Sequence, residues 1–376
     1  MSDSRIPLSD LAYGPEEQNA VARVLAGGWI TMGPEVEAFE REFAAMLGAR
    51  HALAVANGTA AIHLSYLALG LGPGDEIVQP AINFVAAANL SVMIGAQPVF
   101  ADIVALDEPT IDPVQVEAAI TPTTRAVVVM HYGGYLCRMS DIRAVCEKKN
   151  VALIEDACHA VGARHELGAA GTIGDISCFS FFGNKNMATG EGGMVVTNRD
   201  DLAEKVRHLR SHGMTSLSWD RRLGHTRSYD VVTPGFNYRL DDLHAALGRS
   251  QLAKLPVNNK RRGDLVARYR KGLEDLRGWT IPFASYRGDS AYHLMTIVAP
   301  DQPARELVVE ALSKRNVQTS LHYPFIPHFK AFQSAGQDNL GRSDAYATRA
   351  ITLPLYPGLE EEQVERVVTV IRDAVD

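Results

Sequence analysis

The sequence contains few cysteines, and their spacing suits neither a metal site nor a disulfide framework. Among 376 residues there are four cysteines, none of them in a CxxC pair: Cys137, Cys146, Cys158 and Cys178. No histidine pairs with a cysteine at zinc-finger spacing. A structural zinc ion and a fold stabilised by disulfides are therefore not expected. We predict a protein without a metal site, in a reducing compartment and most simply the cytoplasm.

Long apolar runs and an excess of positive charge are also missing. Apolar stretches such as residues 126–130 are too short to span a bilayer. Residues 1–12 carry Asp3 and Asp10 instead of the apolar core of a signal peptide. The chain has 37 basic and 44 acidic residues, a net charge of −7. It therefore has no general attraction for nucleic acid or for an anionic membrane, and we expect neither as a partner. Any anionic ligand must be held by a local site.

Short apolar segments alternate with helical patterns over the first 200 residues. Apolar runs typical of strands cover residues 51–56, 76–79, 98–101, 126–131, 151–155 and 193–197. Helical patterns cover residues 15–25, 35–47, 60–69, 83–94 and 139–149. Apolar strands without polar alternation are typical of a sheet covered on both faces. The alternation predicts an α/β fold with a mostly parallel sheet.

The last third of the chain has a different order of elements. We predict helices at 241–255, ending at Pro256, and then at 260–276, 305–315 and 360–375. Strands are expected at 280–281 and 293–298. This mixed order is typical of an α+β domain, and a length of 376 residues favours two domains over one. We place a large α/β domain at 13–252 and a smaller α+β domain at 253–376, with residues 1–12 packing on the latter.

Three segments contain residues that could carry chemistry. Asn57-Gly58-Thr59 lies between a strand and a helix, where free N–H groups and the helix dipole favour an anion; a plain capped turn is the alternative. Asp156 ends an apolar strand, where ligands gather in open α/β sheets, or it is simply a helix cap. Lys185 follows an aromatic strand and precedes glycines. In an apolar pocket its amine would be uncharged, although most lysines lie on surface loops.

The order of these three segments matches one cofactor. Pyridoxal 5′-phosphate (PLP) needs an anion cradle for its phosphate, a carboxylate for its ring nitrogen and an amine for its aldehyde. Ser180, on the opposite strand face from Phe179 and Phe181, could add a hydroxyl to the phosphate. The glycine-rich segment 168–174 lacks the strand and helix that a dinucleotide loop requires, so we reject a dinucleotide loop there.

From about Asp10 to Ile371, the chain resembles the DegT/DnrJ/StrS aminotransferases, a branch of the fold-type I PLP enzymes. The resemblance rests on an ordered set of short segments, at residues 28–33, 39–40, 57–61, 72–76, 155–160, 180–186, 190–193, 235–239 and 322–324. It implies a large domain with a mostly parallel seven-stranded sheet between helices and a smaller α+β C-terminal domain.

The resemblance also implies roles for individual residues. Lys185 matches the Schiff-base lysine, which also moves the proton, and Asp156 matches the partner of the ring nitrogen. Phosphate ligands match at Gly58, Thr59 and Ser180. Asn237 matches a residue that reaches the phosphate of the neighbouring subunit's cofactor, which implies a homodimer with shared active sites.

Further positions carry weaker expectations. Phe84 would cover the ring face and His159 would lie near the ring hydroxyl, although a core phenylalanine and a structural histidine are the alternatives. Asn237 is alternatively a turn residue. Candidate substrate-binding residues are Trp29, Thr31, Tyr238, Arg239, His322 and Tyr323, and Arg239 suits an anionic group.

The resemblance implies a PLP-dependent transfer of an amino group from L-glutamate to a nucleotide-linked keto sugar, with pyridoxamine 5′-phosphate as the intermediate cofactor form. We favour a dTDP-4-keto-6-deoxyhexose as acceptor, giving a 4-amino-4,6-dideoxyhexose for an antibiotic, another natural product or a surface glycan. A 3-keto sugar nucleotide is the first alternative. A PLP-dependent sugar dehydratase is disfavoured because that sibling has His where this chain has Lys185. A non-catalytic binding protein acting in regulation and a nicotinamide oxidoreductase are further alternatives.

Overall fold

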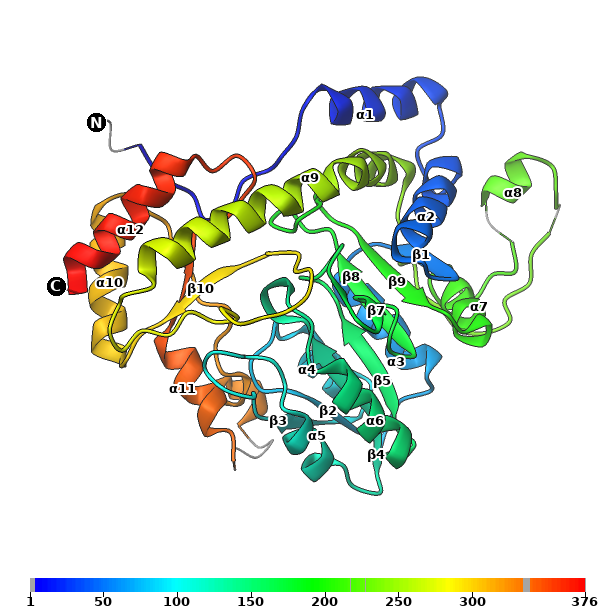
Figure 1. Cartoon of the computed structure of the whole chain (residues 1–376). Helices are drawn as coiled ribbons and strands as arrows, with labels where there is room; N and C mark the ends of the chain where they lie inside the picture. Colours follow the sequence, from blue (N-terminus) through cyan, green and yellow to red (C-terminus); the bar gives the residue numbers. More distant parts are fainter. Residues whose placement is uncertain (1–3, 217, 227, 334–338, 376) are drawn as a thin grey trace.

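A seven-stranded sheet forms the centre of the computed structural model, which describes residues 4–216, 218–226, 228–333 and 339–375 (Figure 1). Its strands, in chain order, are β1 (His51–Val55), β2 (Glu76–Pro80), β3 (Gln97–Ala101), β4 (Thr124–Met130), β5 (Ala152–Asp156), β8 (Ile176–Ser180) and β9 (Gly193–Thr197). Their spatial order is β1-β9-β8-β5-β4-β2-β3, and β9 alone runs antiparallel to its neighbours. The predicted mostly parallel sheet and the fold class are confirmed.

Helices cover both faces of this sheet. One face packs against α2 (Pro34–Leu47), α5 (Pro113–Ala119), α6 (Met139–Lys149) and the first half of α9 (Asp242–Leu273). The other face packs against α3 (Gly58–Ala68), α4 (Ala86–Met93) and α7 (Asp200–Leu209). Alternate residues of β4 point into the two cores, Val127 and Val129 into the first and Ala126 and Val128 into the second. Burial on both faces explains why the strands carry no polar alternation.

A third core joins the C-terminal elements. It contains the second half of α9, α10 (Gln302–Lys314), α12 (Glu361–Val375) and the antiparallel pair β10 (Met295–Val298) and β11 (Ala350–Leu353). Ile6 is fully buried in this core and pairs with Val317, so the N-terminal segment packs on the C-terminal elements. Among the described ranges, no helix combines the length and hydrophobicity that a membrane crossing requires.

The remaining elements lie around these cores. They are α1 (Pro15–Gly27), α8 (Ser218–Arg222), α11 (Gly341–Arg349), the hairpin of β6 (Arg164–His165) and β7 (Gly168–Ala169), and 3₁₀ turns at Tyr132–Gly134, Ile326–His328 and Lys330–Phe332. In Figure 1, α8 projects away from the sheet on the side opposite α12.

The two helices expected on either side of Pro256 are one continuous helix, so that prediction is wrong. Proline removes a backbone hydrogen bond and crowds the preceding turn, which usually ends a helix. Here Pro256 lies on the exposed side of α9. Leu255 on one side and Leu265 on the other are anchored in separate cores, and this packing outweighs the local cost. α9 thus links the two halves of the molecule (Figure 1), and the predicted division at 252/253 lies within it.

Candidate active site

A cavity of about 500 Å³ opens where the strands of the sheet end. β4, β5 and β8 finish at Met130, Asp156 and Ser180, and all three of these residues line it. Ligands of open α/β sheets collect at this edge. Nine predicted site residues, which are spread over 266 positions of the sequence, line the same cavity: Gly58, Thr59, Phe84, Asp156, His159, Ser180, Lys185, His322 and Tyr323. The structure therefore assembles most of the predicted site.

The N-terminus of α3 forms one end of the cavity. The Asn57 side chain caps this helix by accepting a hydrogen bond of 2.8 Å from the backbone N–H of Ala60. A Cβ atom at Gly58 would lie 2.9 Å from the Cβ atom of Ser180 and 3.3 Å from its Oγ atom. The missing side chain thus leaves a cradle between the helix N-terminus and the Ser180 hydroxyl. Such a cradle suits a phosphate group.

Filling this cradle is expected to weaken phosphate binding. In Gly58→Ala the new methyl group must displace the Ser180 side chain, so we expect the dissociation constant for PLP to rise at least ~10-fold, which corresponds to about 1.4 kcal/mol. Equilibrium titration of the purified protein with PLP measures this. Gly341→Ala is the matched control, because a Cβ atom there meets nothing within 4 Å. Equal affinities of the two variants would contradict the assignment.

Asp156 is held in place by two hydrogen bonds. The backbone N–H of Cys158 donates to Oδ1 at 3.1 Å, and the Asn83 amide donates to Oδ2 at 3.5 Å. Asn83 is buried and lines the cavity, although it is not among the residues predicted from the sequence. It follows β2 as Asp156 ends β5, and the rule that ligands gather at strand ends could have identified it.

Lys185 lies in the same cavity after a turn in which its backbone N–H donates to the carbonyl of Phe182. Burial lowers the pKa of the Lys185 amine below its ordinary value, and nearby Cys158 and Asp156 oppose only part of this shift. A larger fraction of the amine is therefore uncharged than for a surface lysine. An uncharged amine can attack a carbonyl carbon or take a proton.

His322 and Tyr323 come from the C-terminal part of the chain and close the cavity. The His322 ring lies 2.9 Å from the hydroxyl of Thr352 on β11. Burial and nearby Lys185 lower the pKa of His322 to about 4, so it is neutral at pH 7. The Phe84 ring is 56% exposed and lies 6.1 Å from the Tyr323 ring. Phe84 is therefore a wall of the cavity and not part of the core.

The residue before Asp156 anchors the end of β5. Glu155 is fully buried and accepts hydrogen bonds from the backbone N–H groups of Gly171, Ile173 and Gly174 at 2.6–2.8 Å. The His131 ring lies 2.9 Å from its second oxygen. The glycine-rich segment rejected above as a dinucleotide loop thus binds a carboxylate of this chain.

Replacing this buried carboxylate is expected to destabilise the fold. In Glu155→Gln an amide NH₂ would face backbone N–H donors, and the buried pair between Glu155 and His131 would be lost. Breaking a buried ion pair costs about 3–5 kcal/mol of unfolding free energy. Burial opposes ionisation, but the hydrogen bonds from His131, Gly174 and Gly171 prevail and hold the pKa of Glu155 below its ordinary value. The contribution of ionised Glu155 to the free energy of unfolding is therefore fully present above the pKa of about 4.3 that this group has in the unfolded chain. It is lost as the pH falls below that value.

Urea denaturation at pH 7 and at pH 4 measures this effect. The difference between wild type and Glu155→Gln should be largest at pH 7 and smaller at pH 4. Glu204→Gln is the control, because Glu204 is exposed on α7. A loss below about 1 kcal/mol at pH 7, the range of exposed pairs, would contradict the role of Glu155.

Five predicted site residues do not line this cavity: Trp29, Thr31, Asn237, Tyr238 and Arg239. Trp29 packs on Trp219 with ring centroids 5.0 Å apart, and the Tyr238 hydroxyl lies 3.2 Å from the His63 ring. Asn237 is exposed. These positions stay predictions, and the role expected for Asn237 requires a second subunit.

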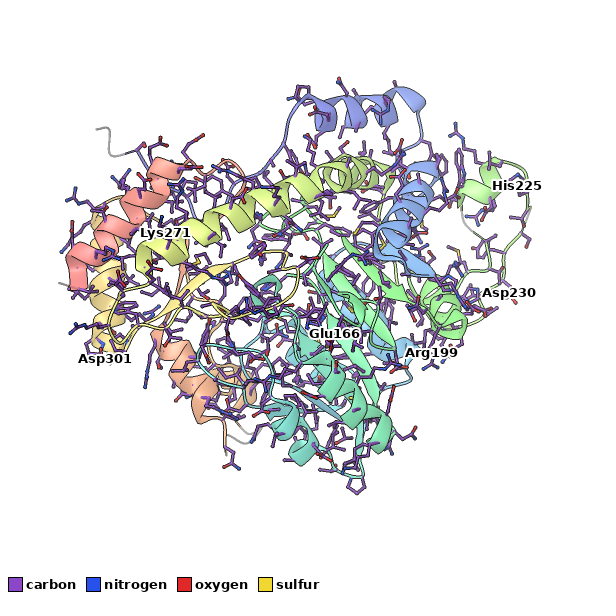
Figure 2. The ribbon with its side chains drawn as sticks, viewed as in Figure 1. Glu166, Arg199, His225, Asp230, Lys271 and Asp301 are labelled. Carbon is purple, nitrogen blue, oxygen red and sulfur yellow. The ribbon has the colours of Figure 1, made fainter. Side chains whose placement is uncertain are left out.

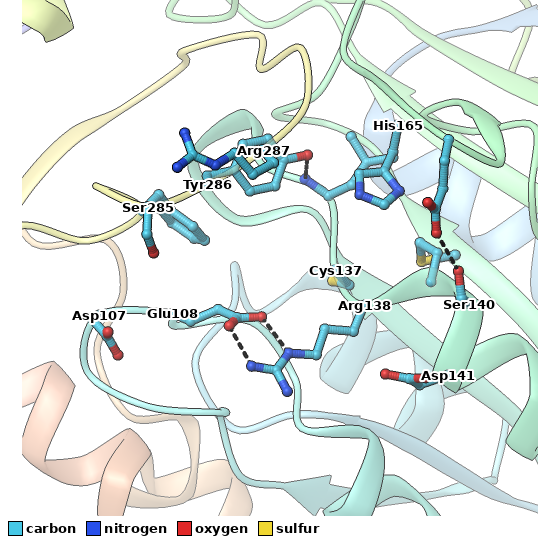
Figure 3. Close-up of a pocket in the computed structure, with 14 residues that line it drawn as sticks. Asp107, Glu108, Cys137, Arg138, Ser140, Asp141, His165, Ser285, Tyr286 and Arg287 are labelled. Atoms are coloured by element: carbon cyan, nitrogen blue, oxygen red, sulfur yellow. Dashed lines mark hydrogen bonds and ion pairs between the residues drawn. The ribbon is translucent and has the colours of Figure 1, made fainter.

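A second cavity, of about 430 Å³, has no lining residue in common with the first. Figure 3 shows the residues that line it. None of the predicted site residues lines it. Arg138 forms two hydrogen bonds with Glu108 across it, at 2.8 and 2.7 Å, and Ser140 donates to Glu166 at 3.2 Å. Arg138 and Glu108 form an ion pair there, and the cavity is lined by neither a glycine cradle at a helix N-terminus nor a lysine. Among the described residues, no cluster of His, Cys, Asp or Glu could hold a metal ion.

The first cavity fits PLP in each of its parts. Gly58, Thr59 and Ser180 would hold the phosphate, Asp156 the ring nitrogen and Lys185 the aldehyde carbon. When bound, PLP supplies a ring that accepts electrons from the reacting carbon. The protein would contribute the carboxylate that keeps the ring nitrogen protonated and the amine that takes and returns a proton.

Comparisons with known proteins agree with this geometry. The model of the DegT/DnrJ/EryC1/StrS aminotransferase family matches residues 12–372. The spore coat polysaccharide biosynthesis protein SpsC of Bacillus subtilis is 40% identical over 385 residues, which cover 98% of this chain and 97% of SpsC.

Solved structures match over nearly the whole chain. PseC of Helicobacter pylori, an aminotransferase involved in pseudoaminic acid biosynthesis, superposes with a TM-score of 0.92 at 28% identity, covering 99% of both chains. DesV of S. venezuelae, in complex with a ketimine intermediate, gives 0.91 at 35% identity, again over 99% of both chains. The chain therefore belongs to the DegT/DnrJ/EryC1/StrS aminotransferase family and is a PLP-dependent aminotransferase.

Proposed function

We propose that this sugar aminotransferase moves the amino group of L-glutamate to the keto group of a nucleotide-linked sugar. The observation that carries the proposal is the single cavity that combines Lys185, Asp156 and the phosphate cradle with His322 and Tyr323. SpsC and PseC are named for polysaccharide and pseudoaminic acid biosynthesis, which supports a sugar as the acceptor.

The preferred acceptor is a dTDP-4-keto-6-deoxyhexose, which would leave as a 4-amino-4,6-dideoxyhexose for a surface glycan or an antibiotic. The segment from His322 to Pro324 and the residues around Lys185 favour the 4-keto position. A 3-keto sugar nucleotide is the second candidate. A regulator that only binds ligands is disfavoured by the amine of lowered pKa in the cavity.

The working unit in this proposal is a homodimer in which each subunit completes the other's site. Asn237 is exposed and outside its own chain's cavity, as a residue that serves the partner must be. Apolar side chains beside it are exposed as well, including Phe236 at 37%, Val231 at 52% and Val232 at 55%. Exposed apolar groups of this kind are typical of an interface.

The decisive experiment is a panel of nucleotide keto sugars with L-glutamate as donor. Product regiochemistry is read by NMR, and the matched pair is a 4-keto and a 3-keto sugar on the same nucleotide. We expect amination at C4. Turnover of the 3-keto sugar alone would overturn the preferred acceptor, and turnover of neither would overturn the nucleotide sugar as substrate.

A further inference from the structure

A chain of hydrogen bonds in the cavity determines which way the protons of two side chains point. The His159 ring lies between two partners. The backbone N–H of Gly133 donates to its Nδ1 atom at 3.4 Å, and its Nε2 atom lies 2.8 Å from the hydroxyl oxygen of Tyr323. His159 is 4% exposed and lines the cavity together with Tyr323.

The first of these contacts fixes the tautomer of His159. A backbone N–H is always a donor, so Nδ1 must present its lone pair. Burial, with Lys185 and His322 nearby, lowers the pKa of His159 well below its ordinary value, so the ring is neutral. In a neutral imidazole with an unprotonated Nδ1, the hydrogen is on Nε2. Nε2–H therefore donates to Tyr323, and the Tyr323 oxygen accepts.

The ring has little freedom to leave this arrangement. His159 packs on His293 with ring centroids 4.3 Å apart, and the Nδ1 atom of His293 lies 2.9 Å from Oδ1 of Asn186. The Asn186 amide donates in turn to the carbonyl of Ala291 at 2.6 Å. Asn186 follows Lys185 in the chain, so this network also fixes the segment that carries the reactive amine.

The hydroxyl hydrogen of Tyr323 then has no acceptor among the described residues. Because its oxygen already accepts from His159, the hydrogen must point elsewhere, and no described residue accepts it. Burial raises the pKa of Tyr323 above its ordinary value, so the hydroxyl keeps this hydrogen at neutral pH. Tyr323 lines the cavity, where an acceptor oxygen of a bound ligand is its natural partner.

We propose that Tyr323 is a catalytic residue that donates a hydrogen bond from its hydroxyl to an oxygen of the bound ligand, and that His159 is the positioning residue that orients it. His159 itself thus has no free N–H for the ligand, in contrast to the role near the ring hydroxyl expected above. Two oxygens share this chemistry, the ring oxygen of PLP and the carbonyl oxygen of the keto substrate. The second of these rests on the proposed function.

The tautomer is tested directly on the PLP-bound enzyme without substrate. Nitrogen NMR of ¹⁵N-histidine-labelled protein distinguishes a protonated from an unprotonated ring nitrogen, and His159→Gln identifies the signals. We expect His159 to carry its hydrogen on Nε2. A hydrogen on Nδ1 would overturn the proposal, whatever the enzyme's substrate.

The donor role is tested with Tyr323→Phe, which keeps the ring and removes the hydroxyl. We expect kcat to fall about 10²-fold, the loss typical of one donor to a developing charge. Tyr292→Phe is the matched control, because Tyr292 is a partly buried tyrosine outside the cavity. Thermal unfolding checks that both variants fold.

Spectra distinguish the two acceptors. If the ring oxygen of PLP accepts, the visible band of the resting variant shifts before any substrate is added, and the half-reaction with L-glutamate slows. If the substrate carbonyl accepts, that band and half-reaction stay as in wild type, and only the reaction with the keto sugar slows. A variant unchanged in both spectrum and rates, within about 3-fold, would overturn the proposal, since a merely packing role predicts that result.

The positioning role of His159 has its own readout. His159→Gln retains an N–H near Tyr323 and should stay within about 10-fold of wild type, whereas His159→Leu should approach Tyr323→Phe. Because the two residues act as a unit, His159→Leu with Tyr323→Phe should be no slower than Tyr323→Phe alone. Fully additive losses would show that His159 acts independently and would overturn this part.

Discussion

Replacing Lys185 with alanine is expected to abolish turnover and the visible absorbance of the bound cofactor together. No other lysine lines the cavity among the described residues, so no second amine can replace it. Loss of the proton transfer alone would slow the reaction by about 10²- to 10⁴-fold, and loss of the covalent bond to the cofactor adds to this. Absorbance of the purified variant with added PLP and initial rates with L-glutamate measure the two effects.

The matched control is Lys271→Ala, on the outer surface of α9 (Figure 2). Lys271 is exposed and far from the chemistry proposed here, so its replacement should leave spectrum and rates unchanged. A Lys185→Ala enzyme that kept the absorbance band and more than about a tenth of the rate, a barrier change below 1.4 kcal/mol, would remove Lys185 from the mechanism.

Short apolar segments without polar alternation predicted the sheet, because this pattern is typical of strands buried on both faces. β4 contains three consecutive valines, and β5 contains the pair Leu153 and Ile154, whose side chains lie in different cores. α9 could not be predicted in the same way. The local rule for Pro256 is sound, but packing at Leu255 and Leu265, which a local pattern does not contain, decides the outcome.

The same difference between local pattern and long-range contact holds for the site residues. Gly58 and Asp156 could be found because one starts a helix and the other ends a strand, and Lys185 because it follows β8 after a short turn. The Glu155 anchor could not, because three of its four partners are backbone N–H groups, which carry no residue-type signal. The hydrogen bond between His159 and Tyr323 joins residues 164 positions apart, so only the fold reveals it.

The second large effect is expected from Asp156→Asn. The substitution keeps the size of the side chain and an oxygen that can accept from the backbone N–H of Cys158. It removes the negative charge that would hold a proton on the ring nitrogen, and charge stabilisation of this kind contributes about 10²- to 10³-fold to rate. We expect PLP to bind, the visible band to form and kcat to fall by that factor. Asp141→Asn, an exposed residue of the second cavity (Figure 3), is the control.

Asn83 allows the charge and its position to be separated. Its amide donates to Asp156, so in Asp156→Asn two NH₂ groups face each other until one rotates. The exchange variant Asp156→Asn with Asn83→Asp restores one carboxylate and one amide but moves the charge from the end of β5 to the segment after β2. Because the ring nitrogen needs the charge at one point, we expect the exchange variant to be as slow as Asp156→Asn. Recovery to within about 10-fold of wild type would mean that the net charge of the pair suffices, and would contradict the role of Asp156 as the partner of the ring nitrogen.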